Sequence, residues 1–316
     1  AISFHGSCDA IGTLSNLLLL IAIILRSPPN LRSYSVILLN SVSIDLIACF
    51  CSLVVMIRVI PADSVLAYIY LGPCTLTSVF ICHFAYTVML HTFAHSLYLI
   101  IVSFSYRFYV LKRPSPSRFR LFLICIVVYL PSLCLMIIFL FALDPQNELL
   151  EAVLLVKPDF EFNQGYMYAG HASIFKPRIA FTIVFMILPA LPAIIVIFIL
   201  RYRVLRILRQ NADSMSKKTH DQHANLVKVL SFQSLLPIFF FGGGVSYVIC
   251  QTGLICSVAQ EHLTMAIWGI MPAAAPLITL YYVRPYKSFV LSLARSPMSV
   301  VTPRGTASTV ISNPHS

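Results

Sequence analysis

Charge is scarce in this sequence. Only 10% of its 316 residues are charged, whereas 59% are hydrophobic, and the mean hydropathy is +0.87. A soluble domain carries about 25% charged residues, so this chain has too little polar surface to cover a globule in water. The scarcity of charge therefore excludes one or two soluble domains and indicates an integral membrane protein.

Signatures of catalysis and of metal binding are also missing. The sequence has no phosphate-binding glycine-rich loop, and no Ser-His-Asp arrangement can be assigned in it. None of the nine cysteines forms a CxxC pair. Six of them lie in apolar runs, where a free thiol behaves as a small hydrophobe: Cys49, Cys51, Cys82, Cys125, Cys134 and Cys250. We therefore predict no enzyme, no cofactor and no zinc site.

Long apolar segments are present instead. Crossing about 30 Å of hydrocarbon takes about 20 apolar residues in a helix. Seven segments are long enough: Ser3–Leu25, Tyr34–Ile57, Tyr68–Phe104, Phe119–Leu143, Pro177–Leu200, Lys228–Gln251 and His262–Val283. We predict an all-α bundle of seven transmembrane helices over residues 1–295. A disordered tail rich in Ser, Thr and Pro is predicted over residues 296–316.

Two details qualify these spans. His5 and Asp9 leave the outer end of the first segment polar. The third segment exceeds what a bilayer needs, which indicates a tilted helix or one that extends beyond the membrane.

The chain begins at Ala1 rather than at methionine and shows no cleavable signal peptide. We expect native residues to precede Ala1 and the first helix to direct membrane insertion.

Positive charge is concentrated on one side of the predicted membrane. Of the 22 Lys and Arg residues, 18 lie in the connections on the side of the C-terminus and four on the other side. The positive-inside rule then places the N-terminus outside the cell and the C-terminus in the cytoplasm. Because the basic residues form short segments between apolar runs, and not one folded face, no nucleic-acid partner is predicted.

Two connections are long enough to have structure of their own. The outer connection over residues 144–176 is acidic and aromatic, and we expect it to form a lid over the bundle. The inner connection over residues 201–227 begins with four arginines spaced between apolar residues, from Arg201 to Arg209. This pattern predicts a basic amphipathic extension of the fifth helix, suited to anionic lipid or a cytoplasmic partner.

Asp45 is the one acid that the sequence places deep in an apolar span, where a charge is costly. Asn16 in the first span is its expected partner. Two hypotheses stay open for this pair. Asp45 is either a buried switch or cation site that holds the bundle in one of two packings, or part of a structural hydrogen-bond cluster between the first two helices.

Three histidines, His83, His91 and His95, lie in the third segment. His91 and His95 are four residues apart and therefore share one helical face, a spacing that can chelate a metal. A catalytic metal site would need a third ligand and a nearby acid. Hydrogen bonding between helices, or ligand contact, is the interpretation we favour.

Prolines punctuate the predicted helices at Pro131, Pro189, Pro192, Pro237, Pro272 and Pro276. Each frees a backbone carbonyl and permits a kink. Pro237 is followed by Gly242, Gly243 and Gly244. This combination indicates either a hinge in the sixth helix or close packing of helices on small residues.

Several motifs resemble those of known seven-helix receptors. Gly12, Asn16, Asn40, Asp45 and Pro276 loosely resemble the pattern of rhodopsin-like receptors. A closer resemblance is to the nematode serpentine chemoreceptors of class delta. Its motifs follow one another over nearly the whole chain: Ser27-Pro-Pro-Asn-Leu-Arg-Ser-Tyr34, Arg58-Val-Ile-Pro61, Tyr68-Ile-Tyr-Leu-Gly-Pro-Cys74, Ser103-Phe-Ser-Tyr-Arg-Phe-Tyr-Val-Leu111, Tyr129-Leu-Pro131, Gly170-His171, Gln233-xxx-Pro237 and Pro276-Leu-Ile-Thr-Leu-Tyr-Tyr-Val-Arg-Pro-Tyr286.

This resemblance implies a G protein-coupled chemosensory receptor in the plasma membrane of a sensory cilium. In many seven-helix receptors a cysteine at the position of Cys74 bridges to the second outer loop, which has no cysteine here. Cys8 and Cys256 are the remaining outer candidates, and we expect a Cys74–Cys256 disulfide. The third segment ends in Ser105-Tyr106-Arg107, and not in an acid-Arg-Tyr triplet, so the Arg-acid lock of rhodopsin-like receptors is not carried over.

The resemblance also implies three sets of site residues. A small, apolar ligand would bind from the outer face between the third, fifth, sixth and seventh helices. Its candidate contacts are Thr77, Phe80, His83, Phe84, Thr87, Phe181, Phe185, Phe239, Tyr247, Met265 and Trp268. Asn16, Asp45, Pro237 and Pro276 are candidate switch residues, and Arg107, Arg201 and Arg206 are candidate contacts for a heterotrimeric G protein.

Two other functions remain as alternatives. A seven-helix ligand-gated channel would place its N-terminus inside the cell, as the seven-helix odorant receptors of insects do. A membrane hydrolase would use zinc with His83, His91 or His95.

Overall fold

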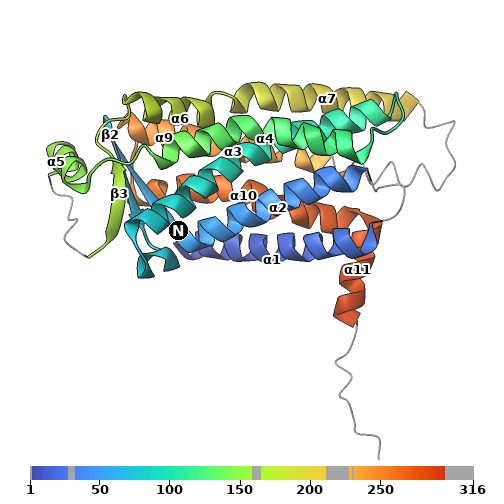
Figure 1. Ribbon diagram of the computed structural model, residues 1–316, viewed down its shortest axis with the longest axis horizontal. Helices are drawn as coiled ribbons and strands as arrows, with labels where there is room; N and C mark the ends of the chain where they lie inside the picture. The colour runs from blue at the N-terminus through green and yellow to red at the C-terminus, as the bar shows by residue number, and fades with distance from the viewer. Residues whose placement is uncertain (1, 28–32, 159–164, 211–227, 230, 296–316) are drawn as a thin grey trace, which may run out of the picture.

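The long helices of this protein run side by side along its long axis, and a small sheet crosses one end of the bundle (Figure 1). The computed structural model describes residues 2–27, 33–158, 165–210, 228–229 and 231–295. The tail predicted to be disordered, 296–316, lies outside this range. We refer to the end that carries the sheet and the start of the first helix as the sheet end, and to the other as the opposite end.

Seven helices in the described part of the chain are long and apolar enough to cross a membrane. They are α1 (Ile2–Arg26), α2 (Tyr34–Val55), α3 (Val79–Val110), α4 (Arg118–Leu140), α6 (Pro177–Ile187) continued by α7 (Ala190–Gln210), the segment Ser231–Gln251 with α9 (Leu236–Gln251), and α10 (Val258–Tyr282). A helix pairs its backbone groups internally, which hydrocarbon requires of any spanning segment. The predicted seven-helix fold is confirmed.

The predicted start of the third helix was wrong. Tyr68 lies in a strand, β2 (Val65–Tyr70), which is followed by a short 3₁₀ helix, η2 (Pro73–Leu76). The chain turns at Gly72, whose amide donates to the carbonyl of Val55 at 3.1 Å. A side chain at Gly72 would collide with the backbone of Val54, so only glycine fits there. The helix α3 begins at Val79, where the Ser78 hydroxyl accepts from the amide of Ile81.

Three antiparallel strands form the sheet, in the order β1-β2-β3. They are β1 (Ile57–Ala62), β2, and β3 (Met167–His171), which comes from the long connection between α4 and α6. A two-residue turn, Asp63–Ser64, joins β1 to β2. Asp63 has φ 51°, a left-handed conformation that aspartate tolerates and that tight hairpins require. This sheet was not among the predictions from the sequence.

The sheet is buried on both faces. Leu66, Tyr68 and Tyr70 of β2 pack onto the helices of the bundle, whereas Ala67 and Ile69 pack beneath a further helix, α5 (Gln146–Val156). This alternation follows from the two-residue period of a strand. Figure 1 shows the resulting layers of bundle, sheet and α5. The connection over residues 144–176 supplies both β3 and α5 and so contributes to a lid over the bundle, as predicted. We call the three-stranded sheet together with α5 the lid.

At the opposite end, two helical segments extend past the spans. The fifth span continues as a basic helix to Gln210, as predicted from the pattern Arg201–Arg209. A separate helix that the sequence analysis did not predict, α11 (Arg284–Arg295), lies across the end of α1 (Figure 1). Its Tyr286 is fully buried, and the phenol oxygen contacts the Ser27 hydroxyl at 3.1 Å. An amphipathic helix in this position suits the membrane surface.

The predicted disulfide was also wrong. Cys74 pairs with Cys82, and Cys250 pairs with Cys256. Both bridges are local, because η2 leads directly into α3 and the end of α9 turns back toward α10. Two of the cysteines expected to be free thiols, Cys82 and Cys250, are therefore bonded.

The pairing predicts the outcome of peptide mapping. Digestion without reduction is expected to release a Cys74–Cys82 linked peptide and a Cys250–Cys256 linked peptide, because each pair is close in sequence and space. Mass spectrometry of the digest before and after reduction checks this. A peptide joining Cys74 to Cys256 would contradict the structure.

Candidate functional site

An apolar cavity of about 40 Å³ lies beneath the sheet. Its roof is Val59 of β1 with Leu66 and Tyr68 of β2, and its walls come from α3, α4, α6, α9 and α10. The few polar groups in the lining are the phenols of three tyrosines, the Thr182 hydroxyl and the indole of Trp268. This cavity has room for little more than a water molecule.

Three of the predicted ligand contacts line this cavity: Tyr247, Met265 and Trp268. The indole nitrogen of Trp268 donates to the Phe240 carbonyl at 2.8 Å. The indole also lies so close to Gly243 that a side chain there would collide with it. This contact favours the packing interpretation of the glycine run.

Most of the other predicted contacts lie elsewhere. Phe80, Phe84, Phe181 and Phe239 are 41–64% exposed on the outside of the bundle. They are apolar because they face lipid, and they do not line the cavity. Phe185 packs against Phe181 and Tyr98.

Thr77, His83 and Thr87 make hydrogen bonds to backbone carbonyls, the two threonines within their own region of the chain and His83 to another helix. The Thr77 hydroxyl donates to Cys74 at 2.6 Å, and the Thr87 hydroxyl donates to His83 at 2.8 Å. The His83 ring nitrogen Nε2 donates to Phe139 of α4 at 3.3 Å, and the ring lies against Phe139.

A second histidine, His171 of β3, extends this aromatic group into the sheet. Its Nδ1 donates to the Ala142 carbonyl at 3.0 Å, and its ring packs edge-on against Tyr68 and Phe139. Burial lowers the pKa of His171 to about 3, so the ring is neutral at physiological pH. His171 therefore fixes the sheet to α4 without placing a charge beside the cavity.

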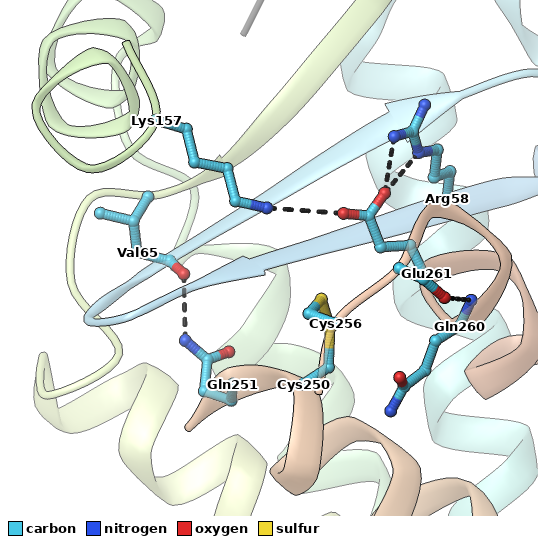
Figure 2. Close-up of polar contacts among 9 residues, drawn as sticks. Arg58, Val65, Lys157, Cys250, Gln251, Cys256, Gln260 and Glu261 are labelled. Atoms are coloured by element: carbon cyan, nitrogen blue, oxygen red, sulfur yellow. Dashed lines mark hydrogen bonds and ion pairs between the residues drawn. A yellow bond between two sulfur atoms is a disulfide. The ribbon is translucent and has the colours of Figure 1, made fainter. Parts of the chain in front are cut away.

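One buried carboxylate, Glu261, fastens the lid to the bundle (Figure 2). Its Oε2 accepts from Nε and Nη2 of Arg58 in β1, at 2.7 Å and 2.6 Å. Its Oε1 lies 3.5 Å from Nζ of Lys157, at the end of α5. We call these three residues the Glu261 cluster. It joins β1 and α5 to the first turn of α10, where the carboxylate is only 5% exposed.

A second contact fastens the hairpin turn to α9. The amide nitrogen of Gln251 donates to the carbonyls of Asp63 and Val65, at 2.6 Å and 3.1 Å. Gln251 is the last residue of α9 and stands next to the Cys250–Cys256 disulfide (Figure 2). The lid is thus tied to the start of α10 and the end of α9, which are two of the five helices that wall the cavity.

The predicted pairing of Asp45 with Asn16 was wrong. Asp45 accepts from the Ser96 hydroxyl of α3 at 2.6 Å. Asn16 instead donates to the carbonyls of Gly12 and Pro272, at 2.9 Å and 3.0 Å. The proline at position 276 cannot bond the carbonyl of Pro272, because it has no N–H, and Asn16 replaces that bond.

Asp45 borders a second small cavity of about 40 Å³ in the middle of the bundle. The polar groups that share this lining include Ser41, Ser103, Gln233 and Thr279, and Pro276 contributes to its wall. Gln233 donates to Thr279 at 3.3 Å, which connects the segment before α9 to α10. Pro237 is buried in the first turn of α9.

Asp9, which was expected to lie at a polar outer end, is fully buried. Its carboxylate lies 3.2 Å from Nε2 of His5, and the same nitrogen lies 2.9 Å from the Ser52 hydroxyl of α2. A side chain at position 269 of α10, which is glycine, would crowd this carboxylate. Nothing in the sequence distinguishes this end of α1 from a solvated one, because its burial depends on α2 and α10.

His91 and His95 face α4. The Nδ1 of His91 donates to the Ser132 carbonyl at 2.7 Å, and the Ser132 hydroxyl lies 3.2 Å from Nδ1 of His95. Both rings pack edge-on against Tyr129. Within the described ranges, no three His, Cys, Asp or Glu side chains gather to hold a metal ion.

At the opposite end, the three predicted G protein contacts differ in accessibility. Arg107 is 5% exposed, lies over the Tyr34 ring and donates to the Tyr34 hydroxyl. Arg201 donates to the Ser231 hydroxyl at 3.4 Å. Arg206 is exposed and lies with Lys112 in a separate pocket between α3 and α7.

Comparison with known proteins matches nearly all of this chain. The sequence profile of the serpentine type 7TM GPCR chemoreceptor Srd matches residues 2–292. The chain belongs to this family. Its relatives in Caenorhabditis elegans include serpentine receptor class delta-19, which is 30% identical over 95% of this chain and 89% of the relative. Serpentine receptor class delta-3 is 31% identical over 89% and 83%. Class delta-18 is 29% identical over 97% and 92%.

In this Srd chain, three of the motifs that carried the resemblance build the lid. The motif Arg58–Pro61 supplies β1 and the arginine of the Glu261 cluster. The motif Tyr68–Cys74 supplies the end of β2 and one half of a disulfide, and Gly170–His171 ends β3. Three of the motifs shared with the class delta receptors thus lie in the lid that covers the cavity.

We expect the substitution Glu261→Gln to loosen the lid. The change removes the charge that binds Arg58 and Lys157, and breaking such a largely buried ion pair is expected to lower the unfolding temperature by about 3–5 °C. Thermal unfolding of purified protein in detergent measures this. Glu151→Gln, at an exposed position of the same lid, is the control and is expected to change the unfolding temperature by less than about 1 °C. Equal shifts in the two variants would show that Glu261 does not fasten the lid.

Proposed function

We propose that this protein is a plasma-membrane chemoreceptor that binds a small apolar ligand in the cavity beneath the sheet and signals to a heterotrimeric G protein at the opposite end. Membership of the Srd family supports the chemoreceptor role. The observation that carries the ligand proposal is the cavity itself. It is apolar, lies at the meeting point of five helices, and is covered by a dedicated lid.

In our proposal the sheet end faces outward. The excess of lysine and arginine on the other side supports this orientation through the positive-inside rule. The cysteines support it independently. Both disulfides lie at the sheet end, and disulfides persist where the surroundings are oxidising, as they are outside the cell.

The cavity as described is smaller than an odorant. Ligand pockets are typically about 300–1,000 Å³, so a ligand must displace side chains or lift the lid. Lifting β1 strains the Glu261 cluster, and lifting the hairpin turn strains the bonds of Gln251. These contacts end on α10 and α9. Ligand binding would therefore favour a second arrangement of those two helices, as a shift in a pre-existing equilibrium.

The polar residues in the middle of the bundle would carry this change onward. Asp45 and Ser96 join α2 to α3, Asn16 joins α1 to α10, and Gln233 joins the sixth span to α10. Pro237 and Pro276 weaken the backbone of the two moving helices next to these bonds. We infer that these residues act as the switch between two packings of the bundle.

A G protein would respond to this change at the opposite end, where it would contact the arginines. Arg107 is held against Tyr34 in this arrangement, and Arg201 is held against the segment before α9. Movement of α9 would free Arg201 first. The active state would then expose Arg107 to the partner, with Arg206 at the edge of the contact.

The cavity predicts a contrast between two neighbouring residues of α6. Ile183 lines the cavity, whereas Val184 is 53% exposed toward lipid. Ile183→Phe is expected to fill the cavity and raise the ligand concentration for half-maximal G protein activation by at least about tenfold, or about 1.4 kcal/mol. Val184→Phe adds similar bulk outside and is expected to change it less than twofold.

The measurement is a G protein activation assay in cells that display each variant at equal surface density, over a panel of volatile apolar compounds. Equal effects of the two substitutions on any activating compound would contradict the cavity as the ligand site. A ligand-gated current without a G protein would contradict the receptor proposal itself and favour the channel.

A further inference from the structure

A basic pocket of about 370 Å³ lies at the opposite end, away from the ligand cavity and the switch. It is formed where the end of α3 meets the end of α7. Its lining is Phe108, Lys112, Arg203, Arg206, Ile207 and Gln210. Three of these six side chains are cations, two are apolar and one is an amide.

The three cations have no carboxylate to neutralise them within the described part of the chain. The acids described there outside the middle of the bundle, such as Asp144, Glu148 and Glu261, are at the sheet end. Lys112 lies over the Phe108 ring at 4.7 Å, which orients its ammonium but leaves its charge. Three positive charges converging on one open pocket attract an anion.

The surface that leads to the pocket faces lipid. Ile195, Ile199 and Tyr202 lie on one face of α7 and are 48–66% exposed. Arg203 and Arg206 follow Ile199 and Tyr202 by one helical turn, so the apolar face becomes basic at the end of the span. An anion in the pocket can therefore be part of a molecule whose chains lie along α7.

We propose that this pocket binds the headgroup of a polyphosphorylated inositol phospholipid. Phosphate oxygens pair with guanidinium and ammonium groups, and a phosphomonoester carries nearly two negative charges. Three cations match such a headgroup better than the single net charge of phosphatidylserine. The volume admits a sugar ring with its phosphates, and Gln210 can bond a ring hydroxyl.

The site shares one residue, Arg206, with the G protein surface of the proposed function. Arg201 points to Ser231 beside α9, whereas Arg203 lies about half a helical turn away, on the side of α3. Arg206 alone belongs to both proposals. Lipid binding can be measured on the purified protein without ligand or G protein, so failure of this proposal is separate from failure of the receptor proposal.

The test is native mass spectrometry of the full chain in detergent, titrated with phosphatidylinositol 4,5-bisphosphate, phosphatidylserine or free inositol 1,4,5-trisphosphate. The variant is Lys112→Ala/Arg203→Ala/Arg206→Ala. The matched control, Arg113→Ala/Arg118→Ala/Arg209→Ala, removes the same charge from exposed neighbours that do not line the pocket. If the variant is not monodisperse, Lys112→Gln/Arg203→Gln replaces it, with Arg113→Gln/Arg209→Gln as its control.

We expect one molecule of the bisphosphate lipid to bind, and to do so at a lower concentration than either of the other two probes. Affinity is expected to fall at least about tenfold in the variant and less than about twofold in the control, because the loss follows the headgroup contacts and not the total charge. Equal losses in the two would overturn the proposal. So would equal affinity for phosphatidylserine, or for inositol trisphosphate, which would identify a site for soluble phosphates.

Discussion

Hydrocarbon offers no hydrogen-bond partner, so every backbone amide inside it must be paired within the protein. Seven helices satisfy this requirement in the described part of the chain, and the strands are confined to the sheet end. There the sheet is covered on one face by the bundle and on the other by α5. The same requirement explains why Asn16 bonds the carbonyl that Pro276 leaves free. The cavity, its lid and the polar contacts between helices all depend on this pairing.

The spans could be predicted from the sequence, because an apolar run of about 20 residues has few other solutions. The strand over Val65–Tyr70 could not be. A run of six apolar residues fits a buried helix or a buried strand equally well, and the choice depends here on pairing with β3, far along the chain. The same dependence on distant partners hid the burial of Asp9 and the helix α11. The disulfide prediction failed for a different reason. The partners are local in both bridges, but Cys82 and Cys250 lie in apolar runs, where the sequence indicates free thiols.

Part of the candidate site followed from the family resemblance, which implies a ligand between the outer halves of the third, fifth, sixth and seventh helices. Tyr247, Met265 and Trp268 lie there and line the cavity. Phe80, Phe84, Phe181 and Phe239 were indistinguishable from them, since aromatic residues serve both lipid-facing and inward-facing positions in a membrane helix. The role of Glu261 required knowing that β1 and α5 meet above α10. From the sequence, its partners Arg58 and Lys157 were recognisable only as basic residues on the predicted outer side.

In the proposed receptor the two ends of the bundle have opposite tasks: the lid and the ligand cavity would face outward, and the cations that would meet lipid and G protein would face the cytoplasm. Both proposals therefore depend on the orientation of the chain in the membrane. The most direct measurement places one epitope tag before Ala1 and another after Ser316, and compares antibody binding to intact and permeabilised cells. The account predicts that the first tag is labelled on intact cells and the second only after permeabilisation. Labelling of the C-terminal tag on intact cells would contradict it.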